Sequence, residues 1–240
     1  MSRLPKTEHL VEHQARWRQI KEAAGLEEEC PSLEYEGPYL TVSRQLGSGG
    51  TELAHRVAAP LGWRVVDREL VAAIAEKTHA SPGAVLAHDE RASGLLDDYF
   101  SHLLVPDDPG HAAYLRAMTM IVASFAREGR VVILGRGANW FLDPERGLRV
   151  RVVAPFSRRV ERIARDENLS VREAEEKLRR HDEEQRRFIE QSFGRAIDDP
   201  LGYDLVLNTA HLDSDQAAEI VTTGLCRKLR RSVVDTGRAG

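Results

Sequence analysis

A cluster of glycines after a short apolar stretch is the part of this 240-residue chain best suited to chemistry. Gly47, Gly49 and Gly50 lie within four positions, after the apolar residues 39–42 and directly before Thr51. Glycines let the backbone approach an anion closely, and the first amides of a following helix point at that anion. Residues 47–51 therefore predict a phosphate-binding loop in a nucleotide-using protein, although the same spacing also occurs in simple tight turns.

The standard loop pattern, G-x-x-x-x-G-K-[ST], is matched only in part. Gly49 and Thr51 take the places of the last glycine and the hydroxyl residue, which makes Thr51 a candidate metal ligand. Arg44 stands where the first glycine is expected, and Gly50 where the lysine is expected. The cation that normally contacts the β- and γ-phosphates is therefore replaced by Arg44 or by an arginine from a later segment.

Arginines cluster in a helix expected from about residue 155. Arg158, Arg162 and Arg165 share the face opposite the apolar residues, and Arg159 lies to one side. Guanidinium groups suit phosphate, so we expect at least one of them to bind it. The neighbouring acidic residues leave open that part of this face is simply solvated.

A second charged helix follows. Ser170 and Glu173 have capping-box spacing and open a helix that carries Arg180, Asp182 and Arg186. Arginines near an acid are what a cover over a phosphoryl-transfer site needs. Many of these charges are also explained as solubilising pairs on the helix surface.

Other polar candidates follow predicted strands or lie in an insertion. Arg136 follows Gly135 at the end of the buried run 131–134, either facing a ligand or exposed in a tight loop. Asp67 ends a predicted strand, and its carboxylate has three candidate roles. It is a ligand of magnesium, a contact to the base or sugar of an acceptor, or the cap of the next helix. Asp89 and Glu90 are candidates for an acceptor pocket.

The elements that must position these residues alternate between strand and helix. We expect strands at 39–42, 63–66, 131–134, 148–153 and 204–207, and helices after 51, at 69–77, at 112–127, from 155, from 170 and at 217–229. Such alternation predicts an α/β fold, with a parallel sheet covered by helices on both faces. Ligands of such sheets bind at the carboxyl ends of the strands.

The composition is that of a globular protein, with 42% hydrophobic and 30% charged residues. The net charge of −4 argues against a general nucleic-acid binder, and no apolar run is long enough to span a membrane. All but five of the 34 basic residues are arginine, which reflects either gene composition or phosphate recognition. Cys30 and Cys226 lack metal-binding spacing, which predicts a reducing, cytoplasmic setting.

With these pieces in place, the chain resembles the cytidylate kinase-like family, a branch of the P-loop nucleoside monophosphate kinases. The likeness extends over roughly residues 38–228. The segments that carry it are Ser43–Gly50, Val66–Leu70, Asp89–Arg91, Ile133–Asn139, Leu148–Pro155 and Asp199–Thr209.

The resemblance implies a P-loop three-layer sandwich with a five-stranded parallel sheet, and phosphoryl transfer from ATP·Mg²⁺ to CMP or dCMP. It implies a P-loop domain at 37–230, with an acceptor-binding insertion at about 80–110 and a lid at about 166–200. Residues 1–36 would be a helical extension that packs on the domain or on a second subunit, and 231–240 a flexible tail.

The resemblance also assigns roles to residues. The donor phosphates would be held by Gly47, Ser48, Gly49, Gly50 and Thr51. The acceptor would contact Asp67, Asp89, Arg136 and Asn139, and the transferring group would be clamped by Arg44, Arg158, Arg162, Arg180, Asp182 and Arg186. The chain departs from the family at Gly50, where a lysine is expected, and at Gly137, where an aspartate is expected. Two further readings stay open: a nucleotide-binding regulatory module without catalysis, and a kinase for another small acceptor.

Overall fold

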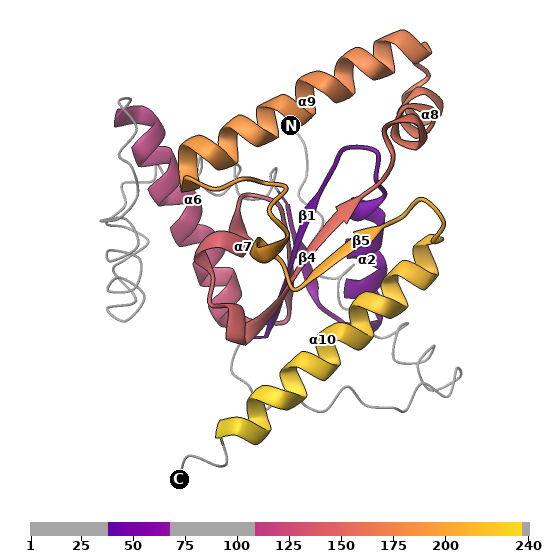
Figure 1. The fold of residues 1–240 in the computed structure, drawn as a ribbon. Coiled ribbons are helices and arrows are strands. Elements are labelled where there is room, and N and C mark those ends of the chain that lie inside the picture. Colours follow the sequence, from indigo (N-terminus) through magenta and orange to yellow (C-terminus); the bar gives the residue numbers. More distant parts are fainter. Residues whose placement is uncertain (1–37, 68–108, 237–240) are drawn as a thin grey trace, which may run out of the picture.

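The computed structural model describes residues 38–67 and 109–236 (Figure 1). The expected extension at 1–36, the helix at 69–77 and nearly all of the insertion at 80–110, including Asp89 and Glu90, lie outside these residues. The last helix continues to Thr236, whereas the sequence places the end of the domain at 230. The other domain boundaries stay a prediction.

Five parallel strands form one sheet in the order β2-β3-β1-β4-β5, which confirms the predicted α/β fold. The strands are β1 (Tyr39–Arg44), β2 (Arg64–Val66), β3 (Val131–Leu134), β4 (Gly147–Val153) and β5 (Leu205–Asn208). β1 is central and pairs with β3 on one side and β4 on the other. Because all five strands are parallel, the segments that follow them meet at one edge of the sheet.

The described helices alternate with the strands. They are α2 (Gly50–Leu61), α6 (Pro109–Glu128), α7 (Ala138–Phe141), α8 (Phe156–Glu167), α9 (Val171–Phe193) and α10 (Ser214–Thr236), with 3-10 turns η1 (Pro144–Arg146) and η2 (Pro200–Gly202). α2 includes Pro60 and ends one residue later, where Gly62 adopts a left-handed conformation. Proline disfavours continuation of a helix, and α2 ends close to it.

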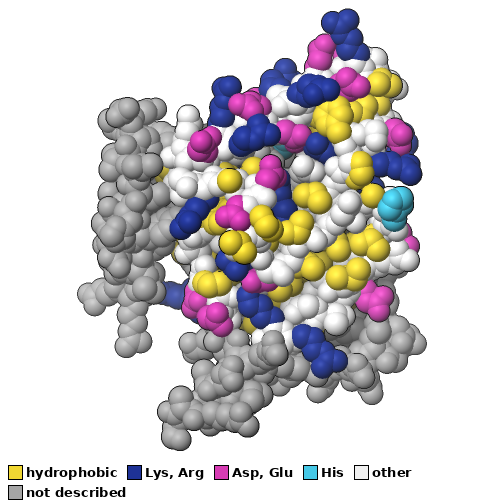
Figure 2. Space-filling model, in the orientation of Figure 1, with side chains coloured by type: hydrophobic (Ala, Val, Ile, Leu, Met, Phe, Trp, Pro, Cys, Tyr) yellow, Lys and Arg dark blue, Asp and Glu magenta, His cyan; other side chains and the backbone are white. Residues whose placement is uncertain are grey.

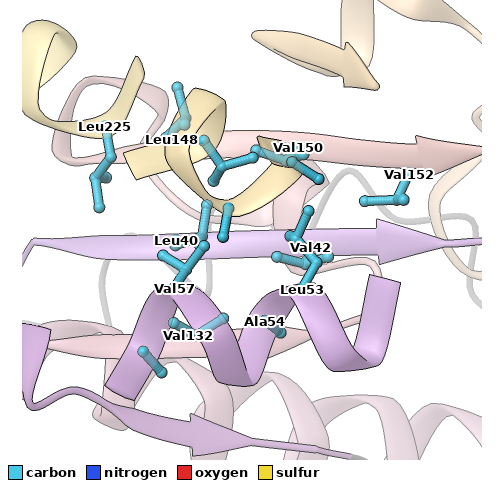
Figure 3. Close-up of a cluster of buried hydrophobic side chains, with 14 of the residues drawn as sticks. Leu40, Val42, Leu53, Ala54, Val57, Val132, Leu148, Val150, Val152 and Leu225 are labelled. Atoms are coloured by element: carbon cyan, nitrogen blue, oxygen red, sulfur yellow. The ribbon is translucent and has the colours of Figure 1, made fainter. Parts of the chain in front are cut away.

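Helices cover both faces of the sheet, as the alternation predicts. On one face, α2 and α10 bury an apolar cluster against β1, β3 and β4, and Figure 3 shows Leu40 and Val42 of β1 pointing toward Leu53 and Val57 of α2. On the other face, α6, α7 and the end of α9 pack against Tyr39, Ile133 and their neighbours. Alternate residues of β1 thus serve opposite cores.

α8 and α9 form a hairpin beyond the carboxyl ends of the strands (Figure 1). Val160 and Ile163 of α8 pack on Ala174 and Leu178 of α9, and Leu46 packs against this third cluster. The capping box that opens α9 is confirmed: Ser170 and Glu173 exchange hydrogen bonds between side chain and backbone. Hydrogen bonds from the Ser170 hydroxyl and amide lower the pKa of Glu173.

A helix of the length and apolar character needed to cross a bilayer does not occur among residues 38–67 and 109–236.

Candidate active site

The turn between β1 and α2 has the backbone of a phosphate-binding loop. Gly47 and Gly49 adopt positive φ angles of 77° and 82°, which favour glycine because other residues lose energy in this region. The amide of Ser48 donates to the carbonyl of Gln45 at 3.1 Å, and the Ser48 side chain donates to the same oxygen at 2.8 Å. The first turn of α2 begins at Gly50, so its amides open onto this loop.

Neighbouring segments hold the loop from two sides. The amide of Gln45 donates to Val152 at 3.0 Å, and its side-chain oxygen accepts from the amide of Ala154 at 3.2 Å. The Thr209 hydroxyl, just after β5, donates to the carbonyl of Ser48 at 2.7 Å. The loop is therefore fixed by the ends of β4 and β5, and Gln45 and Thr209 position it.

Two arginines of α8 lie over the loop. The Arg162 guanidinium lies so close to Gly49 that a Cβ there would overlap it. Arg159 is 4% exposed and donates to the carbonyl of Leu46 at 3.3 Å. The sequence places Arg159 to one side of the helix, but the structure buries it against the loop and the next helix.

Beside the loop lies a pocket of about 260 Å³. It is bounded by Gly47, by the arginine face of α8 and by the segment that follows β5; its lining residues are Gly47, Ala154, Arg158, Glu161, Arg162, Arg165, Thr209, Ala210 and Leu212. The predicted arginine face is therefore the wall of a pocket that opens onto the glycine loop. This arrangement suits an elongated ligand with an anionic end.

A second glycine turn, Gly135–Gly137, follows β3 at the same edge of the sheet. Arg136 has a φ of 59°, and its guanidinium lies 5.7 Å from the centre of the Phe188 ring. Asn139 is 5% exposed and donates its side-chain amide to the carbonyl of Gly202 at 3.3 Å. The structure thus gives Asn139 a supporting contact within the fold, while Arg136 lies at the strand end as predicted.

We predict that Gly137→Ala destabilises the protein far more than Gly194→Ala. Both glycines have positive φ, 66° and 60°, so both variants bear a similar backbone cost of about 1 kcal/mol. A Cβ at Gly137 would also collide with the Phe193 ring, whereas nothing lies within 4 Å of one at Gly194. Overpacking adds roughly 1–3 kcal/mol, and urea unfolding of the two variants measures the difference. Equal losses would contradict the packing.

Arg44 bridges the two glycine turns. Its Nε lies 3.5 Å from the hydroxyl of Thr51 at the start of α2, and its Nη1 lies 2.8 Å from the place where a Cβ of Gly135 would be. The carbonyl of Arg44 accepts a hydrogen bond of 3.3 Å from the side chain of Gln185 on α9. The Arg44 guanidinium therefore lies between the loop and the Arg136 turn.

The charged residues expected on the lid divide into two groups. Asp182 accepts two hydrogen bonds from Arg159, at 2.9 and 2.8 Å, so it joins α9 to α8. Arg186 is paired with Glu183 of its own helix, and Arg180 is exposed. Figure 2 shows basic and acidic side chains intermixed over the end of the molecule where Figure 1 draws α9. The structure brings Arg162 to the loop, but not Arg180 or Arg186.

Two arginines of β4, Arg149 and Arg151, are paired with acidic residues. Arg151, 4% exposed, donates to the Ser43 hydroxyl at 2.9 Å and to Asp198 at 3.1 Å. Arg149 forms a pair with Asp204 at 2.9 Å. The nearby Tyr203 donates to the carbonyl of Ile197 at 2.7 Å, and burial raises the pKa of its phenol. These contacts support the strand ends rather than the loop itself.

Comparison with known proteins finds that the chain is similar to proteins named cytidylate kinase. It is 27% identical over 187 residues to cytidylate kinase of Thermococcus kodakarensis, covering 78% of this chain and 86% of that protein. It is also 27% identical over 187 residues to cytidylate kinase of Pyrococcus horikoshii, covering 78% and 87% of the two chains.

A solved structure shares the fold, and a family model matches most of the chain. The fold matches the crystal structure of an uncharacterized protein from Eubacterium ventriosum with a TM-score of 0.60 and 15% identity, over 78% of this chain and 97% of that one. The model of the cytidylate kinase-like family matches residues 39–211, which include the glycine loop, both arginine helices and Thr209. The chain therefore belongs to the cytidylate kinase-like family.

Proposed function

We propose that the protein transfers the γ-phosphate of ATP to a nucleoside monophosphate, CMP or dCMP. One observation carries the proposal. Two glycine turns lie at the carboxyl edge of the same sheet, the Arg44 guanidinium lies between them, and Arg162 lies over Gly49. Such an arrangement offers cations to the charge that develops on a phosphoryl group in transit.

The donor fits the loop and the pocket beside it. The amides that begin α2 and the Arg162 guanidinium suit the triphosphate, with residues 47–51 around it. The 260 Å³ pocket next to Gly47 suits the nucleoside part. Arg158, which lines this pocket, is 60% exposed in its side chain, so we assign it a weaker role than Arg162.

The acceptor fits the other side of Arg44, near Arg136 and Asp67. An oxygen of the acceptor phosphate attacks the γ-phosphorus, the bond from that phosphorus to the β–γ bridging oxygen breaks, and ADP leaves. The protein contributes alignment and charge neutralisation, which together account for most of the rate in this class of reaction. Asp89 stays a proposed acceptor contact, and Arg180 and Arg186 stay proposed lid residues.

A magnesium ion fits this site through Thr51. Its side chain supplies an exposed hydroxyl at the start of α2, and Mg²⁺ is commonly held by one or two protein oxygens, waters and phosphates. Bound there, the ion would neutralise charge on the phosphate oxygens. Asp67 follows β2, and β3 separates β2 from β1, so the two strands are roughly 10 Å apart. Two direct ligands of one Mg²⁺ lie only about 3–4 Å apart, so we keep Thr51 as the metal ligand and assign Asp67 to the acceptor.

ADP formation tests the proposal. The purified chain is incubated with ATP·Mg²⁺ and CMP, dCMP, UMP, AMP or no acceptor, and we expect ADP to appear fastest with CMP or dCMP. A Gly49→Asp variant purified in the same way controls for contaminating kinases, because its carboxylate repels the phosphates.

The assay also tests the reading as a regulatory module, which the missing loop lysine favours. Saturable ATP binding without ADP release for any acceptor would support that reading and overturn ours. The cytoplasmic location and an oligomer built through residues 1–36 stay predictions from the sequence.

A further inference from the structure

The two departures from the standard phosphate-loop pattern fall on residues that touch each other. A Cβ at Gly50 would lie 2.5 Å from Cβ of Arg44, 3.1 Å from its Cγ and 3.2 Å from Cβ of Val152. Real Cβ atoms essentially never come within 3.0 Å of such a neighbour, so the 2.5 Å approach to Cβ of Arg44 is a collision. The stem of Arg44 therefore fills the space that the side chain of a lysine at position 50 would need.

Strand geometry explains the collision. Residues 40, 42 and 44 alternate with 39, 41 and 43, and Leu40 and Val42 point toward α2 (Figure 3). The side chain of Arg44 continues this row to the point where α2 begins. Gly50 is not among the residues with positive φ in the described chain, so its backbone conformation does not call for glycine. The neighbouring stem does.

The guanidinium at the end of this stem lies where a phosphate-binding cation is useful. It is between Thr51, at the first turn of α2, and Gly135, at the turn that carries Arg136. Two hydrogen bonds fix the backbone here. The side chain of Gln185 donates to the carbonyl of Arg44, and the amide of Gln45 donates to the carbonyl of Val152. The backbone that carries this cation is therefore held by β4 and α9, and the guanidinium itself contacts the start of α2 through Thr51.

We infer that Arg44 and Gly50 are one exchanged unit: the loop cation has moved from the first turn of α2 to the end of β1, and glycine at 50 is the steric condition for it. This inference rests on the proposed function, since it assigns Arg44 to the terminal phosphates of the donor. The loss of the lysine is then a relocation of charge rather than a loss of catalysis.

The test is a double exchange. Arg44→Gly removes the relocated cation, Gly50→Lys adds a lysine against the Arg44 stem, and the double variant restores the full G-x-x-x-x-G-K-T pattern. Calorimetry measures affinity for ATP·Mg²⁺ and for AMP, and ADP formation measures turnover. We expect Arg44→Gly to bind ATP at least about tenfold more weakly, since a hydrogen bond to a charged group is lost. Gly50→Lys should weaken ATP binding as well, because its side chain displaces the Arg44 stem. AMP affinity should change little, and the double variant should return to within about threefold of wild-type ATP affinity.

A second pair of variants gives an answer even if the double exchange does not fold. Arg44→Lys keeps the cation and fits beside glycine at 50, so ATP affinity should fall by about threefold or less. Arg44→Gln keeps most of the stem without the charge and should behave like Arg44→Gly. Thermal denaturation confirms that the variants are folded.

The outcomes separate the inference from the proposed function. Two results would overturn the exchange and leave the proposed kinase standing, provided that wild type binds ATP more tightly than AMP. One is a double variant whose ATP affinity is as low as that of the worse single variant. The other is an Arg44→Gln variant that binds ATP like wild type. If wild type binds neither ATP nor AMP, the proposed function fails and the inference fails with it.

Discussion

Replacing Arg162 with alanine is expected to lower the rate of phosphoryl transfer by on the order of 10³-fold, while ATP affinity falls much less. The Arg162 guanidinium lies over Gly49 at the glycine loop, and an arginine that neutralises a transferring phosphoryl group contributes about this factor. A contact to the triphosphate in the ground state contributes only a fraction of the free energy that corresponds to this factor, because most of the charge develops during transfer. Steady-state kinetics and calorimetry with ATP·Mg²⁺ measure the two effects separately.

The matched control is Arg172→Ala. Arg172 belongs to the same hairpin, is 89% exposed in its side chain and pairs with Glu176 one helical turn away. Surface pairs of this kind contribute little, so turnover should stay close to wild type. A similar loss of turnover in both variants would mean that Arg162 acts through the general charge of the hairpin and not through its place above the loop.

Replacing Asp182 with asparagine is expected to cost about 3 kcal/mol of unfolding free energy. The two oxygens of Asp182 bind Arg159 at 2.9 and 2.8 Å, and the Arg159 side chain is only 5% exposed. Breaking such a pair leaves a buried cation without its counter-ion, which is among the costliest single changes. Urea unfolding measures the loss, and Asp166→Asn, at a carboxylate 50% exposed, should change stability by less than about 0.5 kcal/mol.

This variant also decides between two roles for Asp182. If the carboxylate helps to clamp the transferring group, as the resemblance implies, asparagine should lower turnover and leave stability near wild type. If it holds Arg159, stability should fall, and the apolar double variant Arg159→Met/Asp182→Leu should recover much of it, because replacing both members of a buried pair is often nearly neutral. An undisturbed unfolding curve for Asp182→Asn would refute the structural role.

The sheet and its helices were open to prediction because their patterns are local. Residues 131–134 are uniformly apolar and form the fully buried β3, and the capping box at Ser170 opens α9 as its spacing indicates. The glycine loop was also predictable, since its shape depends on positive φ at Gly47 and Gly49.

Pairings between distant segments were not open to prediction in the same way. A helical wheel of α8 places Arg159 to one side but does not predict its burial, because its partner Asp182 lies 23 positions later on another helix. Thr209 was missed for the same reason, as its partner Ser48 is 161 positions away. The contact of Arg44 with Gly50 had a readable signal, because strand alternation places residue 44 on the side of the following helix.

Leu46 belongs at once to the glycine loop and to the small apolar cluster inside the α8–α9 hairpin. The hairpin cannot swing away as a body without withdrawing a loop side chain from its own core, so the two segments share one cooperative unit. Thermodynamic linkage then makes the effect reciprocal. On the proposed function, a nucleotide that orders the loop is expected to slow amide hydrogen exchange in α9, and a substitution that loosens Leu178 is expected to weaken nucleotide binding.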